Sequence, residues 1–218
     1  MTPFKELTSV AAPVEGADIN TDIIFPARFL LLPEKKGLGE QLFHEKRVNA
    51  PSNQPFVLDY APYNTARIMV AGRNFGCGSS REQAVWALAD FGIRCVIAPS
   101  FGEIFYNNCF KNGVLPLVET GERYAELLAA ASAAEPITID LLGERLVLVS
   151  GKVLPVQVDP FRRAALLAGL DEIGSILATD HADIEAFEQS QRHSEPWLYL
   201  GPEKLACFAD LQDEVVVD

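Results

Sequence analysis

Three short apolar segments in the middle of the chain limit the possible fold more than any other feature. They comprise Ala66–Ala71, Arg94–Ala98 and Val114–Val118, and segments with helical spacing of apolar residues lie between them. Short, continuous apolar runs of this kind are typical of strands that are buried on both faces of a sheet. Because alternating strands and helices form right-handed crossovers, the sequence predicts an α/β fold with a parallel core.

The predicted helices have recognisable limits. Apolar residues recur at helical spacing in Gln83–Phe91, and Arg123–Ala134 is rich in alanine. Ser100 and Glu103 have the spacing of a capping box, which predicts that Ser100 caps a further helix that stops at Gly113.

The segments on either side of this core follow other patterns. Turn residues are frequent before the first apolar segment, so this part is predicted to be loop-rich, with a strand near Ser9–Val14 and a mobile loop at Pro33–Gly39. After the core, glycine turns separate short strands, which predicts an antiparallel meander. These strands are Ile137–Asp140, Arg145–Ser150 and Val153–Val158.

The last part of the chain is predicted to be helical, at Phe161–Ala168 and Ala182–Gln191. We expect residues 1–170 to form the main domain and residues 171–218 to form a C-terminal extension. The tail from Ser194 to Asp218 is either a docking extension or disordered.

Composition restricts the partners of the chain. Of its 218 residues, 18 are Lys or Arg and 30 are Asp or Glu, which gives a formal charge of −12. Nucleic acids and anionic membranes are polyanions, so this balance argues against both, while one local arginine can still bind a small carboxylate. Without a long apolar run or a signal-peptide core, the sequence predicts a soluble, cytoplasmic protein. Four cysteines with no C-x-x-C pair predict free thiols and no metal site.

The segment Gly72–Glu82, GRNFGCGSSRE, joins a predicted buried strand to a predicted helix. Its three glycines allow a sharp turn and a close approach of the backbone to a ligand. The start of the helix offers unpaired N–H groups, and Arg81 adds a fork of donors that fits a carboxylate. The segment therefore predicts a site for a small anion.

Several known motifs do not match this segment. No lysine precedes the serines as in a P-loop, Arg81 stands where a dinucleotide fingerprint has its third glycine, and no Gly-x-Ser-x-Gly elbow is present. Ser79 and Glu82 also have the spacing of a capping box. Spacing alone therefore leaves Ser79 as either a helix cap or a functional hydroxyl.

The same segment, followed by VIAPSFGEIFYNNCFKNGVLPL and preceded by DINTDIIFPARFL, resembles the swivelling-domain half of the aconitase superfamily. The later segments FRRAALLAGLDEIG and AFEQ resemble its isopropylmalate branch, the small subunits of bacterial 3-isopropylmalate dehydratases. The resemblance covers about Ala17 to Gln191. It implies a three-layer β/β/α swivelling domain with a C-terminal helical extension.

The resemblance implies a role for each residue of the motif. The first serine of the family motif is the base, acting as an alkoxide, which implies that Ser79 is catalytic. Ser80 would hydrogen-bond the substrate, and Arg81 would hold one of its carboxylates. The family isomerises a hydroxy acid by dehydration and rehydration, so the implied activity is that of a hydro-lyase.

Two residues near the start of the chain are further candidates. Asp22 matches an acidic position near the family's active site and would orient other groups, or it would serve only as an Asx-turn residue. Arg28 is a candidate substrate-binding residue because it precedes the loop Phe29–Gly39, which corresponds to the region that faces the substrate's side group. The leucines Leu30–Leu32 would suit an isopropyl group or would pack in the core or against a partner.

The family uses a [4Fe–4S] cluster held by three cysteines, and the cysteines of this chain have no such pattern. The resemblance therefore implies that a large subunit carries the cluster and that this chain is inactive alone. The sequence leaves two alternative functions open. One is a related hydro-lyase acting on homoaconitate or on citraconate and other methyl-substituted diacids; the other is a non-catalytic binding module.

Overall fold

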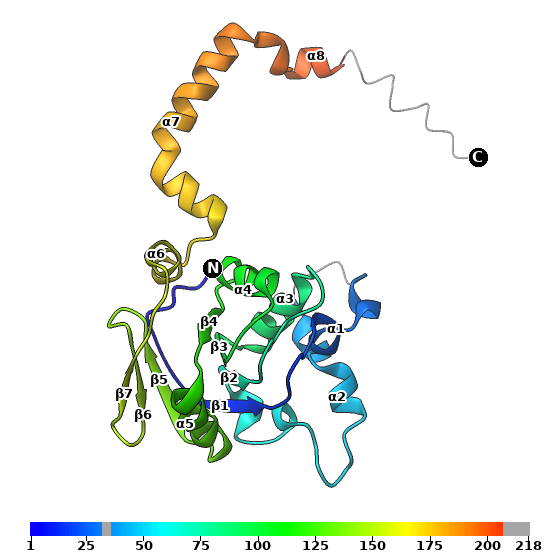
Figure 1. Cartoon of the computed structure of the whole chain (residues 1–218). Helices are drawn as coiled ribbons and strands as arrows, with labels where there is room; N and C mark the ends of the chain where they lie inside the picture. Colours follow the sequence, from blue (N-terminus) through cyan, green and yellow to red (C-terminus); the bar gives the residue numbers. More distant parts are fainter. Residues whose placement is uncertain (32–35, 207–218) are drawn as a thin grey trace, which may run out of the picture. The chain divides into compact units, whose positions relative to one another are not determined.

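The computed structural model describes residues 1–31 and 36–206 (Figure 1). By its contacts the chain separates into two compact units, Met1–Glu172 and Ile173–Asp218. The boundary predicted from the sequence lies two residues earlier, between 170 and 171. The first unit contains the whole sheet and the glycine-rich segment Gly72–Glu82.

A seven-stranded sheet with the order β4-β3-β2-β1-β5-β6-β7 forms the framework of the first unit. Strands β1 to β4 pair in parallel, and β1, β5, β6 and β7 pair antiparallel, so β1 belongs to both halves. The predicted parallel core and antiparallel meander are thus confirmed. The strands are β1 (Glu6–Val14), β2 (Ile68–Ala71), β3 (Cys95–Ala98), β4 (Leu115–Val118), β5 (Pro136–Asp140), β6 (Arg145–Leu148) and β7 (Val153–Pro155).

Helices fill the crossovers of the parallel half and follow the meander. The predicted helix at Gln83–Phe91 has the same bounds in the structure. The α-helices are α1 (Thr21–Ile24), α2 (His44–Val48), α3 (Gln83–Phe91), α4 (Glu103–Lys111), α5 (Gly121–Ser132), α6 (Pro160–Ala168), α7 (Glu172–Ser194) and α8 (Pro202–Ala206). Short 3₁₀ turns occur at Ala27–Phe29, Leu38–Gln41, Val57–Asp59, Tyr63–Thr65 and Pro196–Leu198.

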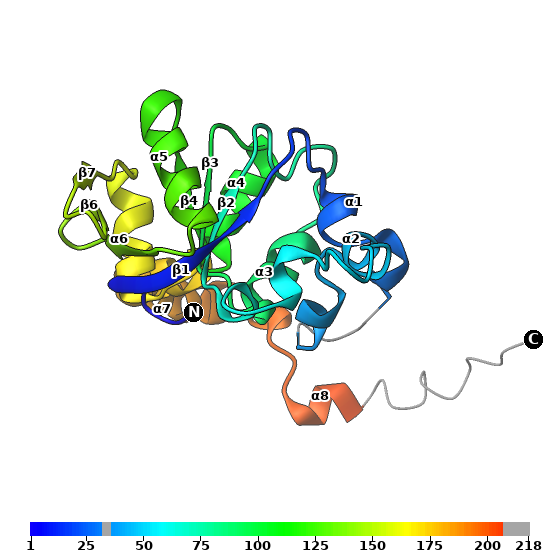
Figure 2. The same cartoon turned by 90° about the horizontal axis from the view of Figure 1, so that it is seen from below.

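Two apolar clusters lie on opposite faces of the parallel strands, because successive side chains of a strand point to opposite faces. Met69 and Ala71 of β2 face the cluster that includes α3 and α4. Ile68 and Val70 face the other cluster, which contains the inward side chains of β5, β6 and β7. The antiparallel half, the parallel half and the helices therefore form the three layers β/β/α. In the view from below, β1 separates the β6–β7 hairpin from α1, α2 and α3 (Figure 2).

The structure corrects two predictions about loops and caps. Ser100 does not cap α4: its hydroxyl accepts a hydrogen bond from the N–H of Asn74 at 2.9 Å, and Gly102 is the N-cap. The segment Pro33–Gly39, predicted as a mobile loop, is packed against the core at its described end. Leu38 is 2% exposed and the N–H of Gly39 donates to Asp90 at 2.8 Å, which fixes this end against α3.

The C-terminal unit contains more helix than the sequence predicted. Helix α7 extends over 23 residues, well beyond the predicted segment Ala182–Gln191, and the region from Ser194 contains a 3₁₀ turn and α8. Positions 207–218 of the predicted tail lie outside the described residues. None of the helices that the structure describes has the length and apolar character needed to cross a bilayer.

Candidate active site

Three loops meet at the carboxyl edge of the parallel strands, where open α/β sheets usually bind ligands. They follow β1, β2 and β3, and two isolated bridges join them. Asn20, in the loop after β1, pairs with Cys77 in the loop after β2. Phe75 in that second loop pairs with Phe101 in the loop after β3. The glycine-rich segment is therefore held between its two neighbours.

The first two loops form a short ladder of backbone hydrogen bonds. The N–H of Gly76 donates to the carbonyl of Ile19 at 2.7 Å, and the N–H of Thr21 donates to the carbonyl of Cys77 at 3.0 Å. Gly78 has a φ of +98°, and a Cβ there would lie 3.2 Å from the Cβ of Asn20. These contacts bring Thr21 and Asp22 beside the serines of the second loop.

Gly76 is required where the second loop passes the start of α4. Its φ is +72°, which side chains other than glycine rarely adopt. A Cβ at this position would lie 2.1 Å from the ring of Phe105. The ring packs directly on the glycine, so the path of the loop toward Ser79 depends on the absence of a side chain.

Ser79 does not cap α3. The N-cap of this helix is Glu82, which makes no side-chain capping bond, and the Glu82 carboxylate instead accepts a hydrogen bond from Asn112 at 2.8 Å. The Ser79 hydroxyl lies 2.5 Å from the Oγ1 atom of Thr21, and either oxygen can be the donor. The capping alternative is therefore wrong, and the half-buried Ser79 hydroxyl has a buried hydroxyl as its neighbour.

Arg81 and Asp22 form an ion pair between the loops after β2 and β1. The contact joins Nη1 of Arg81 to Oδ1 of Asp22, so the other N–H groups of the guanidinium are not used by this contact. Asn20, and not Asp22, caps α1, by accepting from the N–H of Ile23 at 2.9 Å. Asp22 is therefore not the turn-capping residue, and its carboxylate is directed to Arg81.

A hollow of about 410 Å³ lies beside the serines. Ser79 and Ser80 line one side of it, and Gly102, Glu103 and Ile104 at the start of α4 line the other. The exposed Ser80 is thus placed where a ligand bound near Ser79 would meet it.

Arg28 lies apart from this group. It pairs with Glu45 of α2, and its guanidinium stacks over the ring of Phe29, 4.7 Å from the centroid. Arg28 lines neither this hollow nor the larger hollow between α1, α2 and the end of β1. Of the leucines after it, Leu30 packs against the core and Leu31 is 92% exposed, while Leu32 falls outside the described residues.

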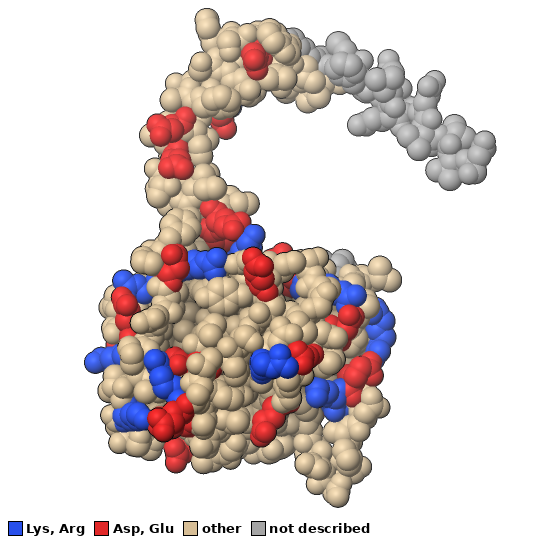
Figure 3. Space-filling view, in the orientation of Figure 1, with Lys and Arg blue, Asp and Glu red and all other residues tan. Residues whose placement is uncertain are grey.

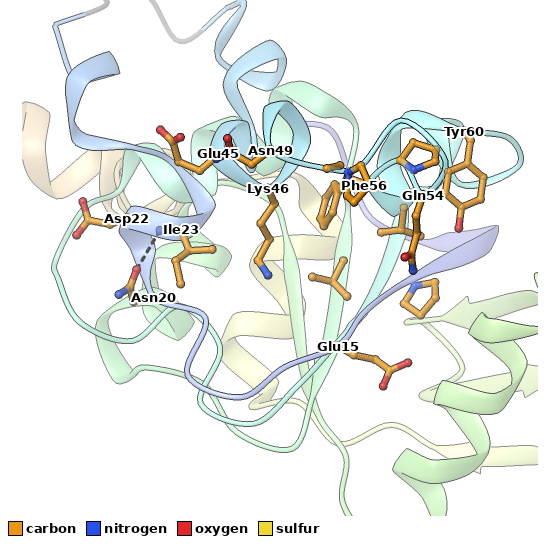
Figure 4. Close-up of a pocket in the computed structure, with 16 residues that line it drawn as sticks. Glu15, Asn20, Asp22, Ile23, Glu45, Lys46, Asn49, Gln54, Phe56 and Tyr60 are labelled. Carbon is orange, nitrogen blue, oxygen red and sulfur yellow. Dashed lines mark hydrogen bonds between the residues drawn. The ribbon is translucent and has the colours of Figure 1, made fainter.

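A larger hollow of about 1000 Å³ lies between α1, α2 and the end of β1 (Figure 4). Its walls include Val14, Ile23 and Phe56, and the Lys46 side chain extends into it (Figure 4). Asp22 also borders this hollow, but its carboxylate is directed away from Lys46 (Figure 4). The two hollows share no lining residue.

The described cysteines do not fit an iron–sulfur cluster. Cys95 and Cys109 are buried among apolar side chains, and burial raises the pKa of both thiols. Cys77 is partly exposed in the glycine-rich loop, and Cys207 lies outside the described residues. Within the described part of the chain, no group of three or more Cys, His, Asp or Glu residues could hold a metal ion.

The face of the first unit shown in Figure 3 carries mixed charge. On the face shown in Figure 3, basic and acidic side chains alternate over the first unit, and acidic side chains are present along the C-terminal unit.

The sequence names Ser79, Ser80, Arg81 and Asp22 as candidates, and in the structure they lie at one edge of the sheet. Thr21, which is only 1% exposed, is not among the candidates named from the sequence. The Asn-Thr-Asp sequence gave no local signal for a buried hydroxyl, because its partner Ser79 is 58 residues away.

Comparison with known proteins shows the family of the chain. Residues 1–121 match the family model of the aconitase C-terminal domain. Two curated proteins named 3-isopropylmalate dehydratase small subunit are close relatives. The one from Paramagnetospirillum magneticum is 47% identical over 202 residues, which is 91% of this chain and 100% of that protein. The one from Gluconobacter oxydans is 49% identical over 202 residues, 91% of this chain and 96% of that protein.

A solved structure gives the same result. The crystal structure of a 3-isopropylmalate dehydratase from Methanocaldococcus jannaschii is similar with a TM-score of 0.60 and 26% identity, covering 86% of this chain and 99% of that one. The fold, the family model and the relatives all agree with the resemblance of the Gly-Ser-Ser-Arg-Glu segment. The chain belongs to the family of 3-isopropylmalate dehydratase small subunits, which is built on the aconitase C-terminal domain.

Proposed function

We propose that this chain forms half of the active site of a 3-isopropylmalate dehydratase, the hydro-lyase that interconverts 2-isopropylmalate and 3-isopropylmalate in leucine biosynthesis. The observation that supports the proposal is the convergence of Ser79, Ser80, Arg81 and Asp22 at one edge of the sheet. A base, a hydroxyl donor and a guanidinium are among the groups that a hydroxy dicarboxylic acid requires for this reaction. The names of the relatives favour this acid over homoaconitate or methyl-substituted diacids.

In the proposed reaction, Ser79 acts as an alkoxide base. Its Oγ takes the proton from the carbon next to a substrate carboxylate, so an O–H bond forms as a C–H bond breaks. The electron pair of that C–H bond becomes the second bond of the alkene, and the hydroxyl leaves the adjacent carbon as hydroxide, which the Lewis-acidic cluster of the large subunit would take up. Rehydration with the opposite orientation then exchanges the two acids: Ser79 returns the proton to the carbon that lost the hydroxyl, and hydroxide adds to the carbon that lost the proton.

Arg81 and Ser80 bind the substrate in this proposal. The Arg81 guanidinium keeps N–H donors beyond the one that contacts Asp22, and these donors can bind a substrate carboxylate in a bidentate manner. Asp22 fixes the guanidinium before substrate arrives, which lowers the entropy lost on binding. Ser80 borders the hollow beside Ser79 and is placed to donate to the second carboxylate or the hydroxyl.

The chain requires a partner in this account. The described residues provide no ligand set for a [4Fe–4S] cluster, so we propose that a separate large subunit holds the cluster and that this chain is inactive alone. The partner would cover the edge of the sheet where the exposed Ser80 and the hollow lie. We further propose a cytoplasmic enzyme with no nucleic-acid or membrane partner, in line with the formal charge of −12.

Substitution of the two serines in the assembled enzyme tests the proposal. Ser79→Ala should lower kcat by about 10²–10⁴-fold, the usual contribution of a general base, and leave binding of the large subunit unchanged. Ser80→Ala, one residue away, should lower kcat/KM by a smaller factor. An assembled Ser79→Ala enzyme that turns over 3-isopropylmalate at the wild-type rate would contradict the proposal.

A further inference from the structure

We infer that Thr21 is a positioning residue that holds the Ser79 oxygen and stabilises its ionised form by donating a hydrogen bond. The inference rests on the proposed role of Ser79 as the base. The Oγ1 atom of Thr21 lies 2.5 Å from the Oγ of Ser79, within the range of an O–H···O hydrogen bond. Thr21 is 1% exposed, so its hydroxyl is shielded from water, while Ser79 is half-buried beside the hollow.

The direction of the hydrogen bond depends on the charge of Ser79. A hydroxyl has one proton to donate, and the contact with Ser79 is the one hydrogen bond found for the Thr21 hydroxyl among the described residues. When Ser79 is neutral, either oxygen can donate. When Ser79 is an alkoxide it has no proton, so Thr21 must donate. The bond therefore becomes charge-assisted only in the ionised state and favours that state.

The backbone fixes Thr21 before any ligand binds. Its N–H is bonded to the carbonyl of Cys77, in the same loop as Ser79, and its carbonyl accepts from Phe25 at the end of α1. Asn20 caps the same turn, and the bridge between Asn20 and Cys77 ties the two loops together. A donor held in this way needs no reorganisation when charge develops on the Ser79 oxygen, which is the property that makes oxyanion holes effective.

Two substitutions at Thr21 distinguish the effect of its hydroxyl from the effect of its branched side chain. In the enzyme assembled with the large subunit, Thr21→Val keeps the branched side chain and should lower kcat by about 10²–10³-fold, as the loss of one oxyanion donor does. Thr21→Ser keeps the hydroxyl and should restore most of the activity. Thr138→Val is a matched control: it removes another threonine pair, Thr8–Thr138 at 2.8 Å, on β1 and β5, and should leave kcat unchanged.

The pH dependence of the rate gives a readout that a purely structural role would not change. The titratable groups near Ser79 are Asp22 on α1, Cys77 and Arg81 on its own loop, and Glu103 at the start of α4. Thr21→Val leaves all four in place. If Thr21 stabilises the alkoxide, the rise of kcat with pH should move upward by about one pH unit or more in Thr21→Val and remain in place in Thr21→Ser.

The outcomes distinguish this inference from the proposed function. A Thr21→Val enzyme with wild-type kcat and pH profile would overturn the inference, even if Ser79→Ala is inactive. Full turnover by Ser79→Ala would overturn the proposed function itself. If Thr21→Val lowers the melting temperature, Thr21→Ala provides a second hydroxyl-free variant, and equal losses in Thr21→Ser and Thr21→Ala would overturn the inference because the hydroxyl would then have no effect.

Discussion

Asp22 and Arg81 form an ion pair across 59 positions of the sequence and so connect the turn of α1 to the loop after β2. The Arg81 side chain is 26% exposed and that of Asp22 is 52% exposed. Pairs with this exposure add only about 0–1 kcal/mol to stability. The pair therefore adds little to the stability of the fold, and in the proposed function it orients the guanidinium of Arg81.

Arg81→Lys should raise KM for the dicarboxylate strongly. Lysine keeps the charge but loses the planar fork that binds a carboxylate through two hydrogen bonds. A charge-assisted bond is worth about 1.5–3 kcal/mol, so KM should rise roughly ten- to hundredfold. Steady-state kinetics of the assembled enzyme measure this. Arg73→Lys is the matched control, because Arg73 forms a similar exposed pair with Asp18 in the same loops and should leave KM unchanged.

Asp22→Asn should raise KM less than Arg81→Lys does, and it should act on the same step, which is binding of the substrate. The amide still accepts a hydrogen bond from Arg81 but does not neutralise it, so we expect a severalfold change in KM with a melting temperature close to that of the wild type. Calorimetry and kinetics on one preparation measure both quantities. A double variant whose effects on KM simply add would show that Asp22 does not act through Arg81.

Gly76→Ala should disrupt the site and lower stability. The alanine must adopt a φ of +72° and its Cβ would overlap the ring of Phe105, so both strain and a clash are expected. Strain alone costs about 1–3 kcal/mol. Gly92→Ala is a control with strain and no clash, since its φ is +111° with no atom within 4 Å of a Cβ. Denaturant unfolding should show a larger loss for Gly76→Ala, and equal losses would contradict the packing argument.

Asp140→Asn should reduce the dependence of stability on acid pH. The N–H of Gly143 bonds to the Asp140 carboxylate at 2.8 Å and, with Arg145 at 3.0 Å, lowers the pKa of this group below its ordinary value of 3.8. A lowered pKa in the folded state stabilises the protein at neutral pH, and this contribution is lost as the pH falls through 3.8 and below. Unfolding midpoints of the two proteins should therefore differ at neutral pH and converge in acid. A difference in unfolding midpoint that stays constant with pH would contradict the assignment of this stability to the Asp140 carboxylate.

The order of strands and helices could be predicted from the sequence because it depends on local patterns. The apolar runs that became β2, β3 and β4 are buried on both faces, and α3 has the predicted bounds Gln83–Phe91. The serine and arginine candidates also followed from one local segment. Helix α7 was underestimated because it buries no side chain, so its apolar residues follow no strong helical pattern.

Contacts between distant segments could not be predicted in this way. The Ser79 and Glu82 spacing suggested a capping box, but Glu82 bonds to Asn112 at the end of α4, and Ser79 bonds to Thr21. Leu38 is buried because Gly39 is anchored to Asp90, 51 positions later. In each case a local pattern was overridden by a tertiary hydrogen bond that joins segments far apart in the sequence.

The most direct test of the proposed half-site is an anaerobic assay of the reassembled enzyme. The chain is mixed with a cluster-loaded large subunit from the same genome, and the unsaturated acid is followed by its ultraviolet absorbance. Substrates are 3-isopropylmalate, homocitrate and citramalate, each offered separately. We predict turnover of 3-isopropylmalate that requires both chains. Turnover of only another acid, or no turnover when the two chains elute separately, would contradict the account.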